Sequence, residues 1–348
     1  MDALRDEPPR ATTADAASVP AEFVEALREL GLVGAERVTG SPLTGGVSSD
    51  IWRIETARGP LCVKRALAKL RVTADWQAPI ARNAYEARWL QVANDAAPGA
   101  APRLLGQHER LGVVAMEYLA PAEHRLWKEE LRHGHAEVAT ARAVGATLAR
   151  IHAYAAARPE LAARFDSDAI FFAIRLEPYL LATARRHPDR AGALEALVER
   201  TRTCRIALVH GDVSPKNILV GGHGPVFLDA ECAWWGDPAF DLAFCLNHLL
   251  LKCLWVPAAA GGFLGCFDRL ADDYLGAVGW EPRAALEARA ARLLPGLFLA
   301  RVDGKSPVEY LTQATDKARV RRVARAFLDR PTTRLASLRC AWAREVGA

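Results

Sequence analysis

The stretch LVHGDVSPKNILVGGHGPVFLDAECAWWGDPAFDL, residues 208–242, is the most informative part of this 348-residue chain. It contains His210-Gly211-Asp212, with Asn217 following five residues after Asp212. A second acid, Asp229, closes a short apolar run, and further acids follow it. The joint pattern favours a functional site, because several residue types must agree at set offsets for it to arise.

Short apolar runs around these polar residues predict strands. Residues 207–209 lead into the turn at His210-Gly211, while residues 218–220 and 226–228 form two short strands joined by a glycine-rich turn. Such a hairpin places Asn217 at the start of one strand and Asp229 at the end of the other. In an antiparallel pair these two ends are neighbours, so both side chains could face one cation.

The residue types suit phosphoryl transfer. In kinase-type sites one Asp accepts the proton of the attacking hydroxyl, while an Asn and a second Asp hold magnesium. Asp212, Asn217 and Asp229 can fill these roles in that order. Hard oxygen ligands in small number suit Mg²⁺. Taken singly, each residue also fits an ordinary role as a cap, a turn former or a core histidine.

The segment resembles the catalytic core of the aminoglycoside phosphotransferase and choline kinase superfamily, the small-molecule relatives of protein kinases. The resemblance rests on HGDxxxxN at residues 210–217, on Asp229, and on GDPAFDLA at residues 236–243. The loop Asp229-Ala230-Glu231 is similar to the DxE loop of methylthioribose kinases. Glu231 is therefore a second candidate metal ligand, and a solvated loop acid is the alternative. The resemblance implies that His210 and Asp241 brace the catalytic loop.

The same resemblance implies an α+β, protein-kinase-like fold with two lobes. Residues 1–20 would be a flexible tail. Residues 21–118 would form a nucleotide-binding N-lobe, an antiparallel sheet with one helix. Residues 119–348 would form a larger, mostly helical C-lobe that carries the catalytic loop, the metal loop and the acceptor site.

The N-terminal half contains residues that match a nucleotide site. Lys64 stands in an apolar strand, where a charged side chain needs a reason, and alternation sends Arg65 to the opposite face. A helix over residues 83–90 offers Glu86 as a partner for Lys64, although a surface ion pair is the alternative. Residues 43–54 read as strand, turn and strand. The nucleotide-binding residues that the resemblance implies are Gly45, Gly46, Ser48, Lys64, Glu86, Glu117 and Leu119.

Two segments are candidates for the acceptor site. In this superfamily the insert before the HGD loop often lines that site, and residues 170–181 are amphipathic. Residues 301–310 are polar, contain Gly and Pro, and predict a loop between the final helices. Packing or plain turn roles are open alternatives for each residue. The candidate acceptor residues are Arg175, Tyr179, Arg301, Asp303 and Lys305.

The amino-acid composition limits the classes of binding partner that we expect for this chain. The net charge of +4 and the interspersed arginines do not indicate nucleic acid, and no apolar run reaches membrane-spanning length. Seven scattered cysteines without a CxxC pair suit reduced thiols in the cytoplasm, and residues 1–17 do not resemble a signal peptide. The implied cofactors are ATP and Mg²⁺, although GTP remains open. The implied partner is a small-molecule hydroxyl acceptor, a neutral or anionic metabolite in preference to an antibiotic.

Three alternatives remain at this point. An antibiotic-modifying aminoglycoside kinase would share every motif named so far. A nucleotide-binding pseudokinase is disfavoured because Lys64, Asp212, Asn217 and Asp229 are all present. A protein kinase is disfavoured because HGD replaces HRD and because the interval from Asp229 to Asp237 leaves no room for an activation loop.

Overall fold

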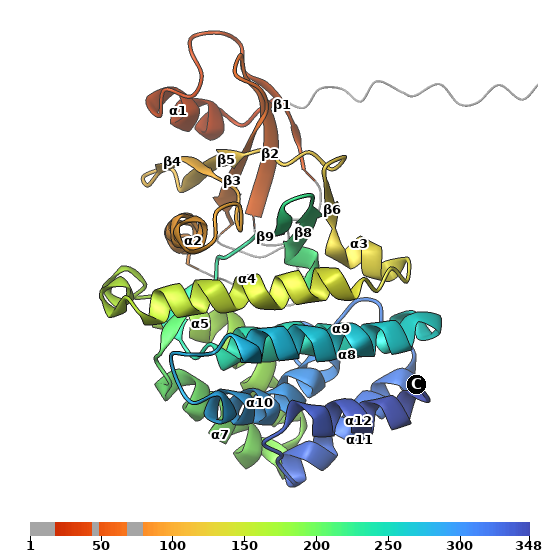
Figure 1. The fold of residues 1–348 in the computed structure, drawn as a ribbon. Helices are drawn as coiled ribbons and strands as arrows, with labels where there is room; N and C mark the ends of the chain where they lie inside the picture. The colour runs from red at the N-terminus through yellow and green to blue at the C-terminus, as the bar shows by residue number, and fades with distance from the viewer. Residues whose placement is uncertain (1–17, 44–48, 68–78) are drawn as a thin grey trace, which may run out of the picture.

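The computed structural model describes residues 18–43, 49–67 and 79–348 of the chain. Its N-terminal part is a five-stranded antiparallel sheet with the order β1-β2-β3-β5-β4, and a mostly helical part lies below it (Figure 1). The strands are β1 (Thr39–Pro42), β2 (Ser49–Glu55), β3 (Leu61–Ala66), β4 (Leu104–His108) and β5 (Val113–Glu117). The α+β, two-lobed architecture expected from the sequence is confirmed.

Alternation along the central strands divides the sheet between two cores. Val63 on β3 and Val113 on β5 pack with Phe23 of helix α1 (Ala21–Glu29) in a small cluster. Val114, the next residue on β5, belongs to the main core below the sheet. Successive side chains of a strand point to opposite faces, so Lys64 faces away from α1 and toward helix α2.

Helix α2 (Arg82–Ala96) is the expected helix of the N-terminal part, and α1 adds a second one that the sequence analysis did not anticipate. Trp89, Leu90 and Val92 of α2 are buried in the main core. This packing fixes the rotation of α2 and points Glu86, which is 2% exposed, into the interior.

The helical part is built around α8 (Ala239–Trp255), in which every residue from Ala239 to Leu254 is buried. Helix α4 lies between the sheet and helices α8, α9 and α10, and α8 packs against both α9 and α10 (Figure 1). The remaining helices are α3 (Trp127–Arg132), α4 (Val138–Ala156), α5 (Asp168–Phe171), the π-helix η2 (Phe172–Leu181), α6 (Ala182–Arg186), α7 (Ala191–Thr203), α9 (Ala260–Gly276), α10 (Arg283–Asp303), α11 (Ala314–Asp329) and α12 (Leu335–Val346). Short 3-10 turns are η1 (Pro159–Arg164), η3 (Pro188–Arg190), η4 (Pro215–Asn217) and η5 (Pro257–Ala259).

Two small sheets hold the informative stretch in place. Strand β7 (Ala207–Val209) pairs with β10 (Trp234–Gly236), while β6 (His124–Leu126), β8 (Ile218–Gly221) and β9 (Gly224–Phe227) form a three-stranded sheet. In the β8–β9 hairpin Ile218 lies opposite Phe227, and the Leu228 N–H donates to the Asn217 carbonyl at 2.8 Å. The predicted hairpin, with residues 217 and 229 at its neighbouring ends, is therefore confirmed.

One loop expectation is wrong in part. Arg301 and Asp303 were expected in a loop, but they form the last turn of α10, and the irregular segment begins at Gly304. Pro307 does not prevent α10 from continuing to Asp303, because a proline mainly restricts the residue just before it and not residues further upstream. Within the described ranges, no helix combines the length and the apolar character needed to cross a bilayer.

Candidate active site

Lys64 is the point at which the two parts of the chain meet. Its ammonium lies 2.9 Å from a Glu86 carboxylate oxygen, and both residues are nearly fully buried. It also forms ion pairs with Asp229 and, at 2.9 Å, with Glu231. Burial alone would lower the pKa of Lys64, but the charges of Asp229, Glu231 and Glu86 raise it well above its ordinary value. The predicted contact between Lys64 and Glu86 is therefore present.

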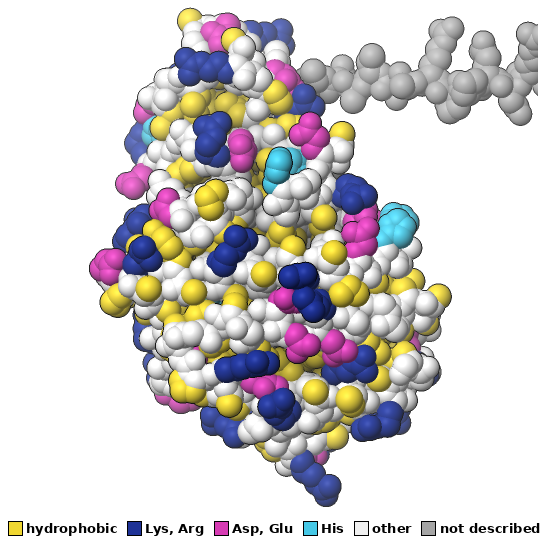
Figure 2. Space-filling model, in the orientation of Figure 1, with side chains coloured by type: hydrophobic (Ala, Val, Ile, Leu, Met, Phe, Trp, Pro, Cys, Tyr) yellow, Lys and Arg dark blue, Asp and Glu magenta, His cyan; other side chains and the backbone are white. Residues whose placement is uncertain are grey.

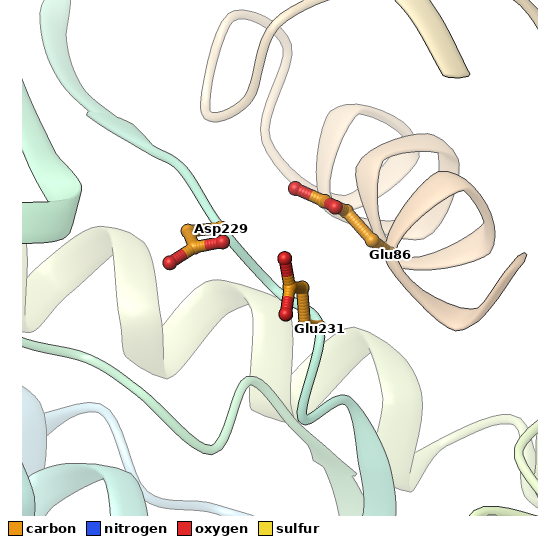
Figure 3. Close-up of side chains that lie close together, drawn as sticks. All are labelled: Glu86, Asp229 and Glu231. Atoms are coloured by element: carbon orange, nitrogen blue, oxygen red, sulfur yellow. The ribbon is translucent and has the colours of Figure 1, made fainter. Parts of the chain in front are cut away.

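Glu86, Asp229 and Glu231 point toward one another from α2 and from the loop after β9 (Figure 3). One carboxylate oxygen from each lies within 4.8 Å of the others. Hard oxygen donors at this spacing suit a divalent cation such as Mg²⁺. Burial raises the pKa of Glu86 to about 7, against the opposing charge of Lys64. Burial would also raise the pKa of Asp229, but the Lys64 charge outweighs it and holds that pKa below its usual range.

Glu231, which follows β9, is held by side chains of the N-terminal part of the chain. The Ser49 hydroxyl of β2 donates to one of its oxygens at 2.5 Å, and Nε of Arg82 donates to the other at 2.7 Å. Glu231 is only 4% exposed, so the alternative of a solvated loop acid is wrong. Arg82 was not singled out in the sequence. The one available signal was a basic residue in the first turn of the α2 helix.

The loop that carries Asp229 has an unusual backbone. Asp229 has φ = +65°, the one non-glycine residue of the described ranges with positive φ. An Asp tolerates this left-handed conformation better than a branched or bulky residue does. Strained conformations of this kind concentrate at functional sites.

Asp212 lies among three nitrogen donors. Its Oδ2 is 3.0 Å from the Arg175 guanidinium, 3.1 Å from the Lys216 ammonium and 2.7 Å from Nδ2 of Asn217. Burial would raise the pKa of Asp212, but the Arg175 and Lys216 charges hold it below its usual range. Asp212 is therefore ionised at neutral pH. Asn217 gives its amide nitrogen to Asp212, which leaves Oδ1 as the atom that could bind a metal.

The expected braces of the catalytic loop make the expected kinds of contact. Asp241 accepts hydrogen bonds from the backbone N–H groups of His210 at 2.7 Å and Gly211 at 2.8 Å. The Asp212 N–H donates to Nδ1 of His210, and Nε2 of His210 lies 3.0 Å from the Leu228 carbonyl. Burial lowers the pKa of His210, so its ring is neutral with the proton on Nε2. His210 thus links the Asp212 loop to the strand that leads to Asp229.

The backbone at position 211 requires glycine. Its φ is +79°, and a Cβ at this position would lie 2.7 Å from both the carbonyl oxygen and the Cβ of Cys232. Positive φ is accessible to glycine without steric cost. The glycine of the HGD motif therefore lets the catalytic loop pass close to the loop after Asp229.

Replacing Asp241 by Ala should destabilise the whole protein. The substitution leaves two buried N–H donors without a partner and removes the acceptor of the His152 ring, whose Nε2 lies 3.2 Å from Asp241. Each unsatisfied buried group costs roughly 1–3 kcal/mol. We expect a loss of about 2–5 kcal/mol in the free energy of unfolding, measured by urea denaturation. An unfolding midpoint equal to that of wild type would show that Asp241 does not brace the loop.

Some predicted nucleotide contacts are only partly visible. Gly45, Gly46 and Ser48 lie outside the described residues. The hinge prediction falls at the end of β5, where the Glu117 carboxylate accepts the Arg103 N–H at 2.8 Å and the chain continues through Leu119 to β6. The adenine contacts predicted for Glu117 and Leu119 stay predictions.

The five candidate acceptor residues divide into two groups. Arg175, Tyr179 and Arg301 are buried and connected, because Arg301 donates to the Tyr179 hydroxyl at 3.1 Å and Arg175 pairs with Asp212. Asp303 is bound instead by Arg321 at 2.7 Å and His187 at 2.8 Å, and Lys305 pairs with Glu177 at 2.9 Å. The structure thus brings the first three toward the catalytic loop and engages Asp303 and Lys305 in other contacts.

Comparisons with known proteins agree with this geometry. Residues 39–287 match the phosphotransferase enzyme family. The methylthioribose kinase of Yersinia pseudotuberculosis is 25% identical over 271 residues, and the match covers 69% of this chain and 66% of that kinase. The chain therefore matches just under two thirds of the length of this relative.

Solved structures share the fold. A structure of the amicoumacin kinase hAmiN in complex with AMP-PNP, Ca²⁺ and Ami superposes with a TM-score of 0.56 at 14% identity, covering 92% of this chain and 96% of the other. The choline kinase of Cryptosporidium parvum gives a TM-score of 0.54 at 11% identity, covering 91% of this chain and 99% of the other. Since the family match spans most of the chain and the fold agrees, the chain belongs to the phosphotransferase enzyme family.

Proposed function

We propose that this protein is a small-molecule kinase that transfers the terminal phosphoryl group of ATP to a hydroxyl group, with Mg²⁺ as the metal. The observation that supports this most is the convergence at Lys64. The Lys64 side chain forms ion pairs with Glu86 of α2 and with Asp229 of the loop after β9. The backbone of Leu228, next to Asp229, is hydrogen-bonded to Asn217 and to the His210 ring. Residues from both parts of the chain therefore meet at one place.

The nucleotide end of the site follows from these contacts. Lys64, steadied by Glu86, is suited to bind phosphate oxygens, while Asp229 and Asn217 offer oxygens to Mg²⁺ with Glu231 as a further ligand. Bound there, Mg²⁺ would offset the negative charge of the phosphates. Lys64 and Asp229 neutralise one another in the present arrangement, so we infer that they separate when nucleotide and metal bind.

The transfer step falls to Asp212. Its carboxylate orients the acceptor hydroxyl and takes its proton as the acceptor oxygen bonds to the terminal phosphorus; the bond from that phosphorus to the bridging oxygen breaks and ADP leaves with the electron pair. A high pKa is not needed, because proton loss can come late in a loose transition state. The lowered pKa of Asp212 keeps it in the proton-accepting form.

An acceptor screen tests this proposal. Purified protein with Mg²⁺ and ATP would be assayed for ADP release against methylthioribose, choline, an aminoglycoside, sugars, sugar phosphates and hydroxy acids. We expect release above the acceptor-free background with at least one hydroxyl compound, and no release without a divalent cation. Nucleotide binding without turnover of any compound would overturn the proposal and favour a nucleotide-binding regulatory module.

A further inference from the structure

A connected set of cationic side chains lies on the acceptor side of Asp212. Arg175 and Lys216 both contact the Asp212 carboxylate. The Arg175 guanidinium lies 5.7 Å from the Tyr179 ring centre, and Arg301 reaches the hydroxyl of the same tyrosine. Three cationic side chains, Arg175, Lys216 and Arg301, therefore lie on the side of Asp212 where we propose that the acceptor binds.

Helix α8 extends this set. Phe244, His248 and Lys252 are four residues apart, so they share one face of the helix. The Phe244 ring centre is 5.8 Å from the Arg175 guanidinium and 5.4 Å from the His248 ring. This face of α8 thus leads from the Asp212–Arg175 pair toward Lys252.

Lys252 is an unusual lysine. It is 1% exposed, and its ammonium lies over the rings of Trp255 at 4.5 Å and Tyr310 at 5.0 Å. Across residues 18–43, 49–67 and 79–348 no carboxylate forms an ion pair with it, whereas Lys64 and Lys128 do have such partners. A buried cation without a counter-charge is costly, so this arrangement calls for an explanation.

Neighbouring polar groups are also unsatisfied. Three buried atoms have no hydrogen-bond partner among the described residues: Nε2 of His248, Nε of Arg301 and the Tyr310 hydroxyl. The Arg301 Nε–H and the Tyr310 hydroxyl are hydrogen-bond donors, and Nε2 of His248 is also a donor when it carries the ring proton. Burial and the charge of Arg301, with those of Lys252, Lys216 and Lys128, lower the pKa of His248 well below its usual value. These causes place His248 within the field of the same cations.

We propose that Lys252, His248, Arg301 and Tyr310 bind an anionic group, a phosphate monoester or a carboxylate, carried by the hydroxyl acceptor. This inference rests on the proposed kinase function and names its substrate class. An anion would supply the missing counter-charge of Lys252 and acceptor atoms for the unsatisfied donors. A polycation would meet the charges of Arg175, Lys216, Arg301, Lys252 and Lys128, while the nearby carboxylates of Asp212 and Glu309 are already ion-paired with cations of this set.

Matched acceptor pairs test the substrate class. Ribose 5-phosphate adds a phosphate to ribose, glycerate carries a carboxylate in place of one hydroxymethyl group of glycerol, and choline and kanamycin serve as cations. We expect kcat/KM at least 100-fold higher for the anionic member of a pair that is turned over. The phosphate and carboxylate pairs separate the two sources of negative charge. Preferred turnover of the neutral or cationic compounds would overturn the inference and leave the kinase function intact.

The variant Lys252→Met keeps an unbranched side chain that is one heavy atom shorter and removes its charge. We expect KM for the anionic acceptor to rise at least 10-fold while KM for ATP stays unchanged. Lys317→Met is the matched control, since Lys317 lies on α11, which packs against α7, α10 and α12. Because the burial cost of the cation disappears, the Tm of Lys252→Met at pH 6 should rise. Unchanged acceptor kinetics in this variant would overturn the inference.

The pH profile gives a further readout. Burial, with the charge of Lys128, lowers the pKa of Lys252 to about 7, and the facing groups Glu309, Glu129 and Arg301 contribute smaller effects. Lys252 is therefore cationic below pH 7 and loses its charge as the pH rises. We expect kcat/KM for the anionic acceptor to fall above pH 7 in wild type and Lys317→Met but to lack this step in Lys252→Met. An identical profile in all three proteins would contradict an anion-binding role.

A binding arm separates this inference from the kinase proposal. With Mg²⁺ and ADP present at saturation, inorganic phosphate should raise the Tm of wild type and of Lys317→Met but not of Lys252→Met. If no compound is phosphorylated, the kinase proposal fails. The change in Tm with phosphate still tests whether Lys252 belongs to an anion site. Equal stabilisation of all three proteins by phosphate would remove Lys252 from anion binding.

Discussion

Replacing Asp212 by Asn should lower kcat by about 10²- to 10⁴-fold, the range that general acid–base catalysis supplies. The amide has nearly the same shape as the carboxylate but cannot accept the proton of the acceptor hydroxyl. Since Asp212 does not contact Lys64 in the described structure, the Kd for Mg·ATP should stay within about threefold of wild type. Steady-state kinetics with a confirmed acceptor and calorimetry with a non-hydrolysable nucleotide measure the two effects.

Folding of this variant must be checked separately. Arg175 is 8% exposed, and removing its carboxylate partner from a buried pair can cost about 3–5 kcal/mol. The Tm should therefore fall, and the assays belong well below it. Asp272→Asn, an exposed position on α9, is the matched control and should behave as wild type in both assays. Near-full turnover by folded Asp212→Asn would remove Asp212 from the base role.

The same carboxylate links stability to pH. The pKa of Asp212 is lower in the folded protein than the ordinary value, so its stabilising contribution is complete above the unfolded-state pKa near 4. That contribution is lost as the pH falls through the folded-state pKa. As the pH is lowered from 5, the free energy of unfolding of wild type should therefore fall by more than that of Asp212→Asn.

Replacing Asp229 by Asn should abolish the magnesium-dependent part of nucleotide binding. Asn accepts the positive φ of this position, so the backbone of the loop is preserved where Ala would add strain. The neutral side chain is a weaker ligand for a hard divalent cation and no longer pairs with Lys64. We expect the Kd for Mg·ATP in calorimetry to rise at least 100-fold.

Binding of ATP without a divalent cation is the internal control for this variant. Lys64 keeps its contacts with Glu86 and Glu231, so metal-free affinity should change much less than metal-dependent affinity. Asp272→Asn should show the full magnesium effect. If Mg·ATP binds Asp229→Asn as tightly as it binds wild type, Asp229 does not belong to the metal site.

The surface is consistent with a site that depends on buried groups. In the face shown in Figure 2, basic and acidic side chains are interspersed, without one large patch of a single sign. Five charged side chains on which the proposals rest, those of Lys64, Glu86, Glu231, Arg175 and Lys252, are each less than one tenth exposed. Specificity therefore has to be sought in the interior contacts.

Local patterns in the sequence predicted individual elements, and the family resemblance that short motifs carry predicted the fold. The hairpin from Ile218 to Phe227 combines two short apolar runs with a glycine turn, and the strand around Lys64 alternates regularly. Such features depend on near neighbours in the chain, whose geometry is set by backbone propensity and side-chain periodicity. The resemblance to the phosphotransferase family, carried by residues 210–243, was likewise a matter of fixed short spacings.

Contacts between distant segments could not be predicted in this way. The sequence placed Arg175 in an acceptor segment, but its ion pair with Asp212 depends on how η2 packs against the catalytic loop. Arg82 and Glu231 are 149 residues apart in the chain and 2.7 Å apart in space. No periodicity encodes such a pair, because the chain must first close the loop between its two members.

The sequence alone thus predicted the two-lobed fold, the loop of His210 to Asp212 as a candidate site and the pairing of Lys64 with Glu86, because each follows from residues at short, fixed offsets or from the resemblance to a family motif. Only the tertiary structure decided that Glu231 is buried between Ser49 and Arg82, and that Lys252, which forms no ion pair within the described residues, lies near Arg301, His248 and Tyr310. Burial and net local charge are sums over segments from the whole chain, so they exist only once packing has brought those segments together.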